Sequence, residues 1–295
     1  MQNAECRMNA KTGSASAISF CILHFAFCIF FLAGCGTTDR INPSFSVSTD
    51  TAKQILAGEA AHPKALVRPL VIVGGYFDPG IAAPIMGGHF RDWTHDRRIV
   101  TVSLGLCFTI EQCRRHIIDE VDEAFPTSDP NETTEVDVIG YSLGGLASRY
   151  AAEDPKPGME PQRRLRIARL FTISSPLRGA VAAESIPLIN VMPLVRTMTP
   201  GSDVIRGVAL PHGADEIYPV YSYVRLRDYE VGSSNAALPG QSAWWVQAPP
   251  LLRPHGLAFT DARILADILL RLHDETPLST EPPAPLPPPA EQPAN

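Results

Sequence analysis

Apolar and polar positions along this chain form blocks that predict strands and helices in turn. An apolar, β-branched run over residues 70–73 is typical of a buried parallel strand, and further strands are expected over 99–104, 136–139, 167–173 and 218–224. Apolar residues recur at helical spacing over 112–125, 143–153 and 260–272, and a short helix is expected over 49–60. Strands that alternate with helices predict the α/β class, with a doubly wound, mostly parallel sheet.

Two stretches do not follow this alternation. Residues 174–212 carry several prolines and glycines between two expected strands, where either a lid is inserted or the chain makes an irregular structural excursion. Residues 274–295 are proline-rich from 277 onward and almost lack large apolar side chains, so a disordered tail is expected. The main domain is therefore assigned to residues 66–273.

The first 34 residues have the pattern of a targeting segment. Arg7 and Lys11 precede an apolar stretch over residues 17–32, which is short for a membrane-spanning helix, and Met8 is an alternative start. The segment closes on Leu-Ala-Gly before Cys35, which resembles the bacterial lipoprotein signal and implies a lipidated Cys35. Residues 35–65 would then be a tether and a short helix, and Gly36 favours the outer membrane. An ordinary secretory signal or an uncleaved anchor are the alternatives.

The remaining cysteines bear on a disulfide, and the net charge bears on the kind of partner. Cys107 and Cys113 are the two that lie beyond the N-terminal segment, and export permits a disulfide between them; two reduced thiols are the alternative. The 295 residues are 45% hydrophobic, enough for a sizeable core. The net charge of −6 argues against nucleic acid as the main partner.

The motif with the most chemical content is G-x-S-x-G at residues 140–144, centred on Ser142. It follows the strand over 136–139 and precedes the helix over 143–153, the context of a nucleophile elbow. Such a turn exposes the serine hydroxyl at the top of a sheet and needs small neighbours. The sequence therefore predicts Ser142 as a nucleophile.

A serine nucleophile needs a base and an acid, which follow it in that type of site in the order acid, then histidine. The histidines after Ser142 are His212, His255 and His273. His273 is expected near a helix end, where a positive charge has a structural role, and His212 precedes the best acid. His255 lies in a loop directly before the last helix and is the predicted base.

The acid should follow a late strand. Asp228 comes just after the strand expected over 218–224, and Glu230 is its nearest competitor. Asp215 and Glu216 precede that strand. The alternative for Asp228 is a solvated charge paired with a neighbouring arginine.

The oxyanion formed in such a reaction needs backbone donors. One is expected from Leu143, which begins the helix after the serine. The second is expected from Gly75 or Tyr76, in the glycine loop after the strand over 70–73. A tight turn without a catalytic role is the alternative for that loop.

These segments together resemble the α/β-hydrolase superfamily and, within it, bacterial lipases and lipase-like esterases. The resemblance rests on residues 71–76, 138–150 and 172–179 and on His255, and extends from about 66 to 272. Many such lipases have His-Gly where this chain has Gly74-Gly75. The resemblance implies acyl transfer to water through Ser142, Asp228 and His255, with a lipid or small acyl ester as substrate and neither a metal nor a cofactor. An acyltransferase or thioesterase with the same triad, and a catalytically silent lipoprotein that binds partners, are the competing hypotheses.

Overall fold

The structure, a computed structural model, describes residues 40–76, 78–185, 192–209, 218–248 and 253–288. From Ile41 onward these residues belong to one compact unit. The expected signal segment over 1–34 and the expected lipidation site Cys35 lie outside the described residues. No helix among those described has the length and apolar character needed to cross a bilayer.

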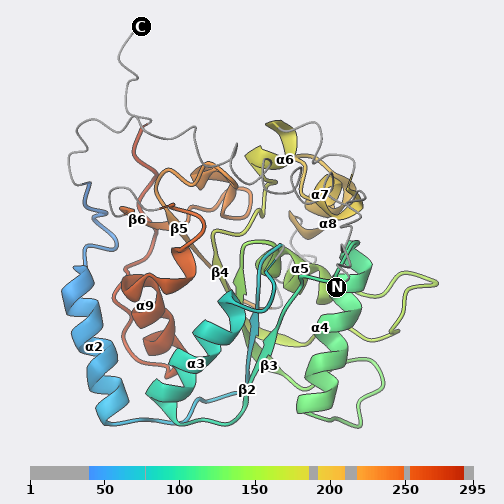
Figure 1. Cartoon of the computed structure of the whole chain (residues 1–295), viewed down its shortest axis with the longest axis horizontal. Helices are drawn as coiled ribbons and strands as arrows, with labels where there is room; N and C mark the ends of the chain where they lie inside the picture. The colour runs from blue at the N-terminus through green and yellow to red at the C-terminus, as the bar shows by residue number, and fades with distance from the viewer. Residues whose placement is uncertain (1–39, 77, 186–191, 210–217, 249–252, 289–295) are drawn as a thin grey trace, which may run out of the picture. The chain divides into compact units, whose positions relative to one another are not determined.

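The centre of the unit is a sheet of six strands in the order β2-β1-β3-β4-β5-β6, and every neighbouring pair is parallel (Figure 1). The strands are β1 (Leu70–Val73), β2 (Ile99–Val102), β3 (Val136–Tyr141), β4 (Ile167–Ile173), β5 (Val220–Arg225) and β6 (Trp244–Val246). The prediction of a parallel, doubly wound sheet is confirmed. The short strand β6 was not expected, because three residues give too little pattern to separate it from a loop.

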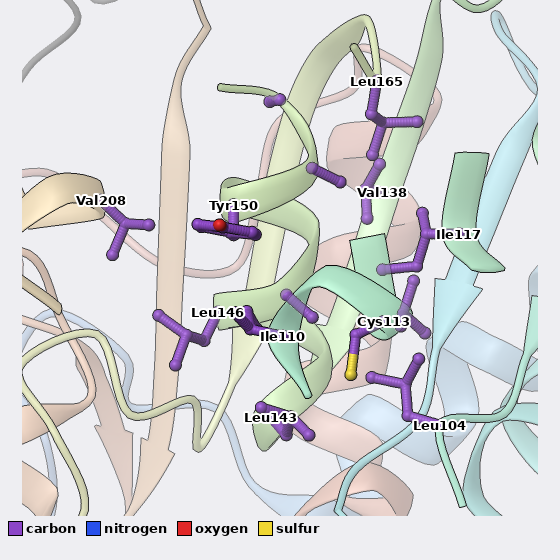
Figure 2. Packing of buried hydrophobic residues seen from close by; sticks show 14 of the residues in the cluster. Leu104, Ile110, Cys113, Ile117, Val138, Leu143, Leu146, Tyr150, Leu165 and Val208 are labelled. Atoms are coloured by element: carbon purple, nitrogen blue, oxygen red, sulfur yellow. The ribbon is translucent and has the colours of Figure 1, made fainter. Parts of the chain in front are cut away.

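Helices cover both faces of this sheet (Figure 1). One face carries α2 (Thr49–Ala61), α3 (Ala82–Thr94) and α9 (Ala262–Leu272), and the other carries α4 (Ile110–Ala124) and α5 (Leu143–Ala151). Side chains of β1 alternate between the two cores, with Val71 and Val73 in one and Leu70 and Ile72 in the other. Figure 2 shows the core between α4, α5 and the sheet, where Ile117, Leu146 and Val138 pack together.

Helix α3 was not expected from the sequence. Pro84 and two glycines suppress its helical pattern, although proline is tolerated in a first turn. Gly87 is needed for packing, because a Cβ there would lie 2.4 Å from the Cγ2 of Thr101 on β2. The helix therefore lies unusually close to the sheet at this point.

The stretch between β4 and β5 contains three short helices in its described part. They are α6 (Val181–Ser185), α7 (Pro193–Thr197) and α8 (Asp203–Ala209). Leu194, Val195 and Val208 are buried in the same core as α5, so this cap is anchored to the domain. Two 3-10 turns, η2 (Ser233–Asn235) and η3 (Ala258–Thr260), lie in loops after β5 and before α9.

The described parts of both terminal segments differ from what the sequence predicts. Residues 41–48 are not a free tether: Asn42 is buried and its Nδ2 donates to the carbonyl oxygen of Trp245 at 2.8 Å. The expected disordered tail is ordered through 288, because the indole nitrogens of Trp244 and Trp245 donate to the carbonyls of Thr280 and Pro285 at 3.0 and 3.1 Å. A proline-rich segment lacks backbone donors but keeps its carbonyl acceptors, and the two indoles on the edge strand use them.

The possible disulfide is also absent from the structure. Cys107 and Cys113 are free, buried thiols, and a hydrogen bond joins their side chains. Cys113 faces inward from the first turn of α4, where it packs in the core shown in Figure 2. The alternative of two reduced cysteines therefore describes the structure.

Candidate active site

Ser142 sits on a strained turn between β3 and α5. Its φ of 54° and ψ of −126° lie in a region that non-glycine residues rarely adopt. Small neighbours make the turn possible: a Cβ on Gly140 would lie 2.3 Å from the Cα of Gly145, and one on Gly144 would lie 2.3 Å from the Val73 carbonyl oxygen. The G-x-S-x-G motif thus forms a strand-turn-helix elbow, as its sequence context predicts.

The structure brings Ser142, His255 and Asp228 into one hydrogen-bonded chain. Ser142 Oγ lies 2.9 Å from His255 Nε2, and His255 Nδ1 lies 2.9 Å from Asp228 Oδ2. Ser142 follows β3, Asp228 follows β5 and His255 precedes η3, so three segments that are distant in sequence meet at the carboxyl edge of the sheet. All three residues are buried, with exposures of 9%, 7% and 2% for Ser142, His255 and Asp228.

Asp228 is held by its own loop. Its Oδ1 accepts hydrogen bonds from the backbone N–H groups of Glu230 at 3.2 Å and Val231 at 3.0 Å, which leaves Oδ2 for His255. Burial alone raises the pKa of the Asp228 carboxyl, but the hydrogen bond and charge of His255 and the backbone donor more than offset it and lower that pKa overall. Asp228 is therefore ionised beside the imidazole.

Tyr141 also holds His255, through its hydroxyl and through its ring. The hydroxyl of Tyr141 donates to the His255 carbonyl oxygen at 3.0 Å, and the two rings lie 5.5 Å apart. Burial alone lowers the pKa of the His255 imidazole, whereas the hydrogen bond and charge of Asp228, aided by Glu230, raise it overall. An imidazole whose Nδ1–H is taken by Asp228 presents the lone pair of Nε2 to Ser142.

Two backbone segments approach Ser142 where oxyanion donors were expected. Leu143 is the first residue of α5, so its N–H has no partner within the helix. On the other side, a Cβ on Gly75 would lie only 3.1 Å from the Ser142 Cβ. The side chain of Tyr76 reaches the cap, where its hydroxyl donates to Met192 Sδ at 3.3 Å.

The departure from His-Gly in the first loop has a steric cause. A Cβ on Gly74 would lie 2.3 Å from Asp78 Oδ2. Asp78 is buried and accepts hydrogen bonds from the backbone of Ile81 and Ala82, which begins α3. Asp78 thus occupies the space that a larger side chain at position 74 would need. This role of Asp78 was not predicted from the sequence, although Asp before Pro-Gly is a turn signal.

Of the other candidate residues, Glu230 lies near the site, with its Oε2 3.8 Å from His255 Nε2, whereas His273 has a place elsewhere. His273 ends α9, with its Nδ1 3.3 Å from Glu59 Oε2, which agrees with a structural role. His212, Asp215 and Glu216 lie outside the described residues. The alternative for Asp228, a solvated charge paired with Arg225 or Arg227, does not apply to Arg225, which pairs with Asp261 at 2.9 Å.

Residues that could hold a metal are not grouped in the described ranges: no cluster of three His, Cys, Asp or Glu side chains occurs there. The arrangement at the sheet edge is instead suited to proton transfer between Ser142 Oγ and His255 Nε2. Tyr141 was also not predicted as a functional residue, because the second position of the G-x-S-x-G motif has no fixed identity.

The parallel sheet with helices on both faces and a serine elbow after its third strand has the α/β-hydrolase fold. No protein-family profile and no curated protein matches the chain. Among solved structures, the propeptide form of the Bacillus licheniformis lipase BlEst2 is similar at a TM-score of 0.50 and 13% identity, over 77% of this chain and 53% of that one. The chain therefore spans about half of that form.

Two further solved structures are similar to this chain at lower TM-scores. The mature form of BlEst2 has a TM-score of 0.47 and 13% identity over 74% of this chain and 95% of that one. The phospholipase PlaB from Legionella pneumophila, in complex with thio-NAD, has a TM-score of 0.45 and 12% identity over 68% and 57%. At this identity the comparison bears on the fold alone, and the propeptide form, at a TM-score of 0.50, is the match that supports it.

Proposed function

We propose that this protein is a serine ester hydrolase, of the lipase or carboxylesterase type, that works through an acyl-enzyme. The observation that carries the proposal is the pair of 2.9 Å contacts that join Ser142, His255 and Asp228 at the elbow. That geometry supplies a nucleophile, a base and a group that orients the base.

In the proposed reaction, His255 Nε2 takes the proton of Ser142 as its Oγ attacks the ester carbonyl. The backbone N–H groups of Leu143 and of Gly75 or Tyr76 stabilise the negative oxygen that forms. Asp228 stabilises the imidazolium, which then gives its proton to the departing alcohol. Water, activated by His255, cleaves the acyl-enzyme and restores the serine. These residues complete the cycle without a metal or a cofactor.

An apolar acyl ester is the proposed substrate class. Exposed apolar side chains flank the site on the loops that build it, with Tyr229 beside Asp228, Leu257 near His255, and Val181 at the start of the cap. The names of the similar structures, a lipase and a phospholipase, agree with this class. We further propose that the cap between β4 and β5 borders the acyl site as a lid, since Met192 contacts Tyr76.

The location of the protein is also a proposal. The N-terminal apolar segment and Cys35 support an exported lipoprotein, held by its acyl chains on the outer membrane. Labelling with radioactive palmitate, in the wild type and in Cys35→Ala, tests it: label on both or on neither chain would contradict lipidation at Cys35.

The function is tested with 4-nitrophenyl esters of increasing chain length, the wild type and Ser142→Ala. We expect turnover by the wild type and background turnover by the variant. Background turnover by both would favour a silent binding protein. Adding an alcohol acceptor separates a transferase, which would form the new ester faster than the free acid. A matched acyl thioester and oxygen ester separate a thioesterase, which would prefer the thioester.

A further inference from the structure

A second carboxylate lies near the ring nitrogen of His255 that does not face Asp228. Glu230 Oε2 is 3.8 Å from His255 Nε2, the nitrogen that also contacts Ser142 Oγ. The side chain of Glu230 is 44% exposed, whereas that of Asp228 is 0% exposed. One carboxylate is therefore buried behind the imidazole, and the other lies at the open side of the reacting atoms.

Among the described residues, no fixed cation neutralises the charge of Glu230. Within the ranges that the structure describes, no ion pair joins Glu230 to a lysine or arginine. Arg225, the nearby buried guanidinium, is paired with Asp261. The surroundings of Tyr141 agree with an excess of negative charge: burial raises the pKa of its hydroxyl, the charges of Glu230, Asp228 and Asp78 raise it further, and Arg225 opposes them.

The backbone of Glu230 is fixed between the acid loop and the cap. Its N–H donates to Asp228 Oδ1 at 3.2 Å, and its carbonyl accepts from Ala182 of α6 at 2.9 Å. The next carbonyl, that of Val231, accepts from Val181 at 3.2 Å. The backbone of Glu230 is therefore held on both sides, which fixes the position in the loop from which its side chain reaches His255.

We propose that Glu230 selects esters by the charge of their leaving group, and that it disfavours anionic alcohols against neutral and cationic ones. The inference rests on the proposed ester hydrolysis. The imidazolium of His255 gives its proton to the leaving oxygen from Nε2, so the departing alcohol must pass close to Glu230. A negative group on that alcohol meets the Glu230 carboxylate, and a positive group is attracted by it.

The expected effect is moderate. Glu230 is partly exposed, so the water-like limit of Coulomb's law applies to charges about 4 Å apart. The interaction energy in that limit is about 1 kcal/mol. At 1.4 kcal/mol per tenfold, this energy corresponds to a change of roughly fivefold in kcat/KM. The effect should shrink as salt is raised, because exposed charges are screened.

Three butyrate esters of meta-substituted phenols test the proposal, with trimethylammonium, carboxamide or carboxylate as the substituent. The leaving groups have similar size and differ in charge, and the rate of each with hydroxide corrects for their intrinsic reactivity. The enzymes are the wild type, Glu230→Gln and Glu230→Lys. Glu123→Gln, which removes the same charge from an exposed position on α4, is the matched control.

We expect the wild type to prefer the cationic over the anionic ester. Glu230→Gln should raise kcat/KM for the anionic ester relative to the neutral one by roughly fivefold, Glu230→Lys should reverse the preference, and Glu123→Gln should match the wild type. Preferences that are the same in the wild type, Glu230→Gln and Glu230→Lys would overturn the assignment of Glu230.

Ser142→Ala keeps this failure separate from a failure of the proposed function. If that variant loses turnover of all three esters while the Glu230 variants keep the wild-type preference, only the role of Glu230 is wrong. If Ser142→Ala turns them over as the wild type does, the serine mechanism is wrong and the inference falls with it. A Glu230 variant that misfolds is recognised by loss of the neutral-ester activity together with a lowered Tm, and the other substitution then decides.

Discussion

Replacing Asp228 by Asn tests the electrostatic arrangement of the site. The variant keeps the shape of the side chain but removes the charge that faces His255 Nδ1 at 2.9 Å. During acyl transfer the imidazole becomes positive, and a unit charge about 4 Å away stabilises it by about 4 kcal/mol at an effective dielectric of about 20. Loss of that charge corresponds to a fall in kcat of roughly a thousandfold.

The pH profile gives a second, independent sign. The His255 imidazole acts as a base only above its pKa, so kcat/KM falls as the pH drops through that pKa. Burial lowers this pKa and Asp228 raises it, with Glu230 contributing in the same direction. Removing the Asp228 charge should therefore move the acidic limb of the profile to lower pH while the plateau falls.

The assay is the pH dependence of kcat/KM for 4-nitrophenyl butyrate. Asp119→Asn, which changes an exposed position on α4, is the control and should match the wild type. A plateau within a few-fold of the wild type, or a fall without a shift of the acidic limb, would refute the role of Asp228.

Two further substitutions test the positioning of the site. Tyr141→Phe removes the hydrogen bond to the His255 carbonyl, at a cost of about 1 kcal/mol. We expect kcat to fall about fivefold with KM little changed. An equal effect on KM would contradict a positioning role for Tyr141. Gly144→Ala places a Cβ 2.3 Å from the Val73 carbonyl oxygen, so calorimetry should show a loss of about 3 kcal/mol of stability. Gly58→Ala, in open space on α2, should instead stabilise by about 0.5–1 kcal/mol, and equal effects of the two would contradict the packing argument.

The elements that the sequence predicted well are those whose burial is regular. Strand β4 is predicted over its full length, because apolar residues occupy most of 167–173 and Arg169 is the one charged residue in it. The elbow is equally predictable, since only glycine fits at positions 140 and 144 on either side of the turn. Chain order then restricts the base and the acid to a few residues, of which the structure joins His255 and Asp228 to the serine.

Contacts between distant segments account for what the sequence did not predict. The C-terminal segment looked disordered by composition, yet it is ordered by hydrogen bonds from the side chains of Trp244 and Trp245. Glu230 appeared only as a competing acid, because its place on the Nε2 side of His255 depends on how the loop after β5 turns back. Contacts between distant segments leave no pattern in the local sequence.

Covalent labelling of Ser142 tests the central proposal most directly. A 4-nitrophenyl alkylphosphonate reacts with an activated serine and mimics the tetrahedral intermediate at the expected oxyanion donors. We predict one equivalent of released 4-nitrophenol, one adduct by intact mass, and its location on Ser142 by peptide mapping, with no adduct in Ser142→Ala. An unmodified wild type, or an adduct that persists in Ser142→Ala, would contradict the account.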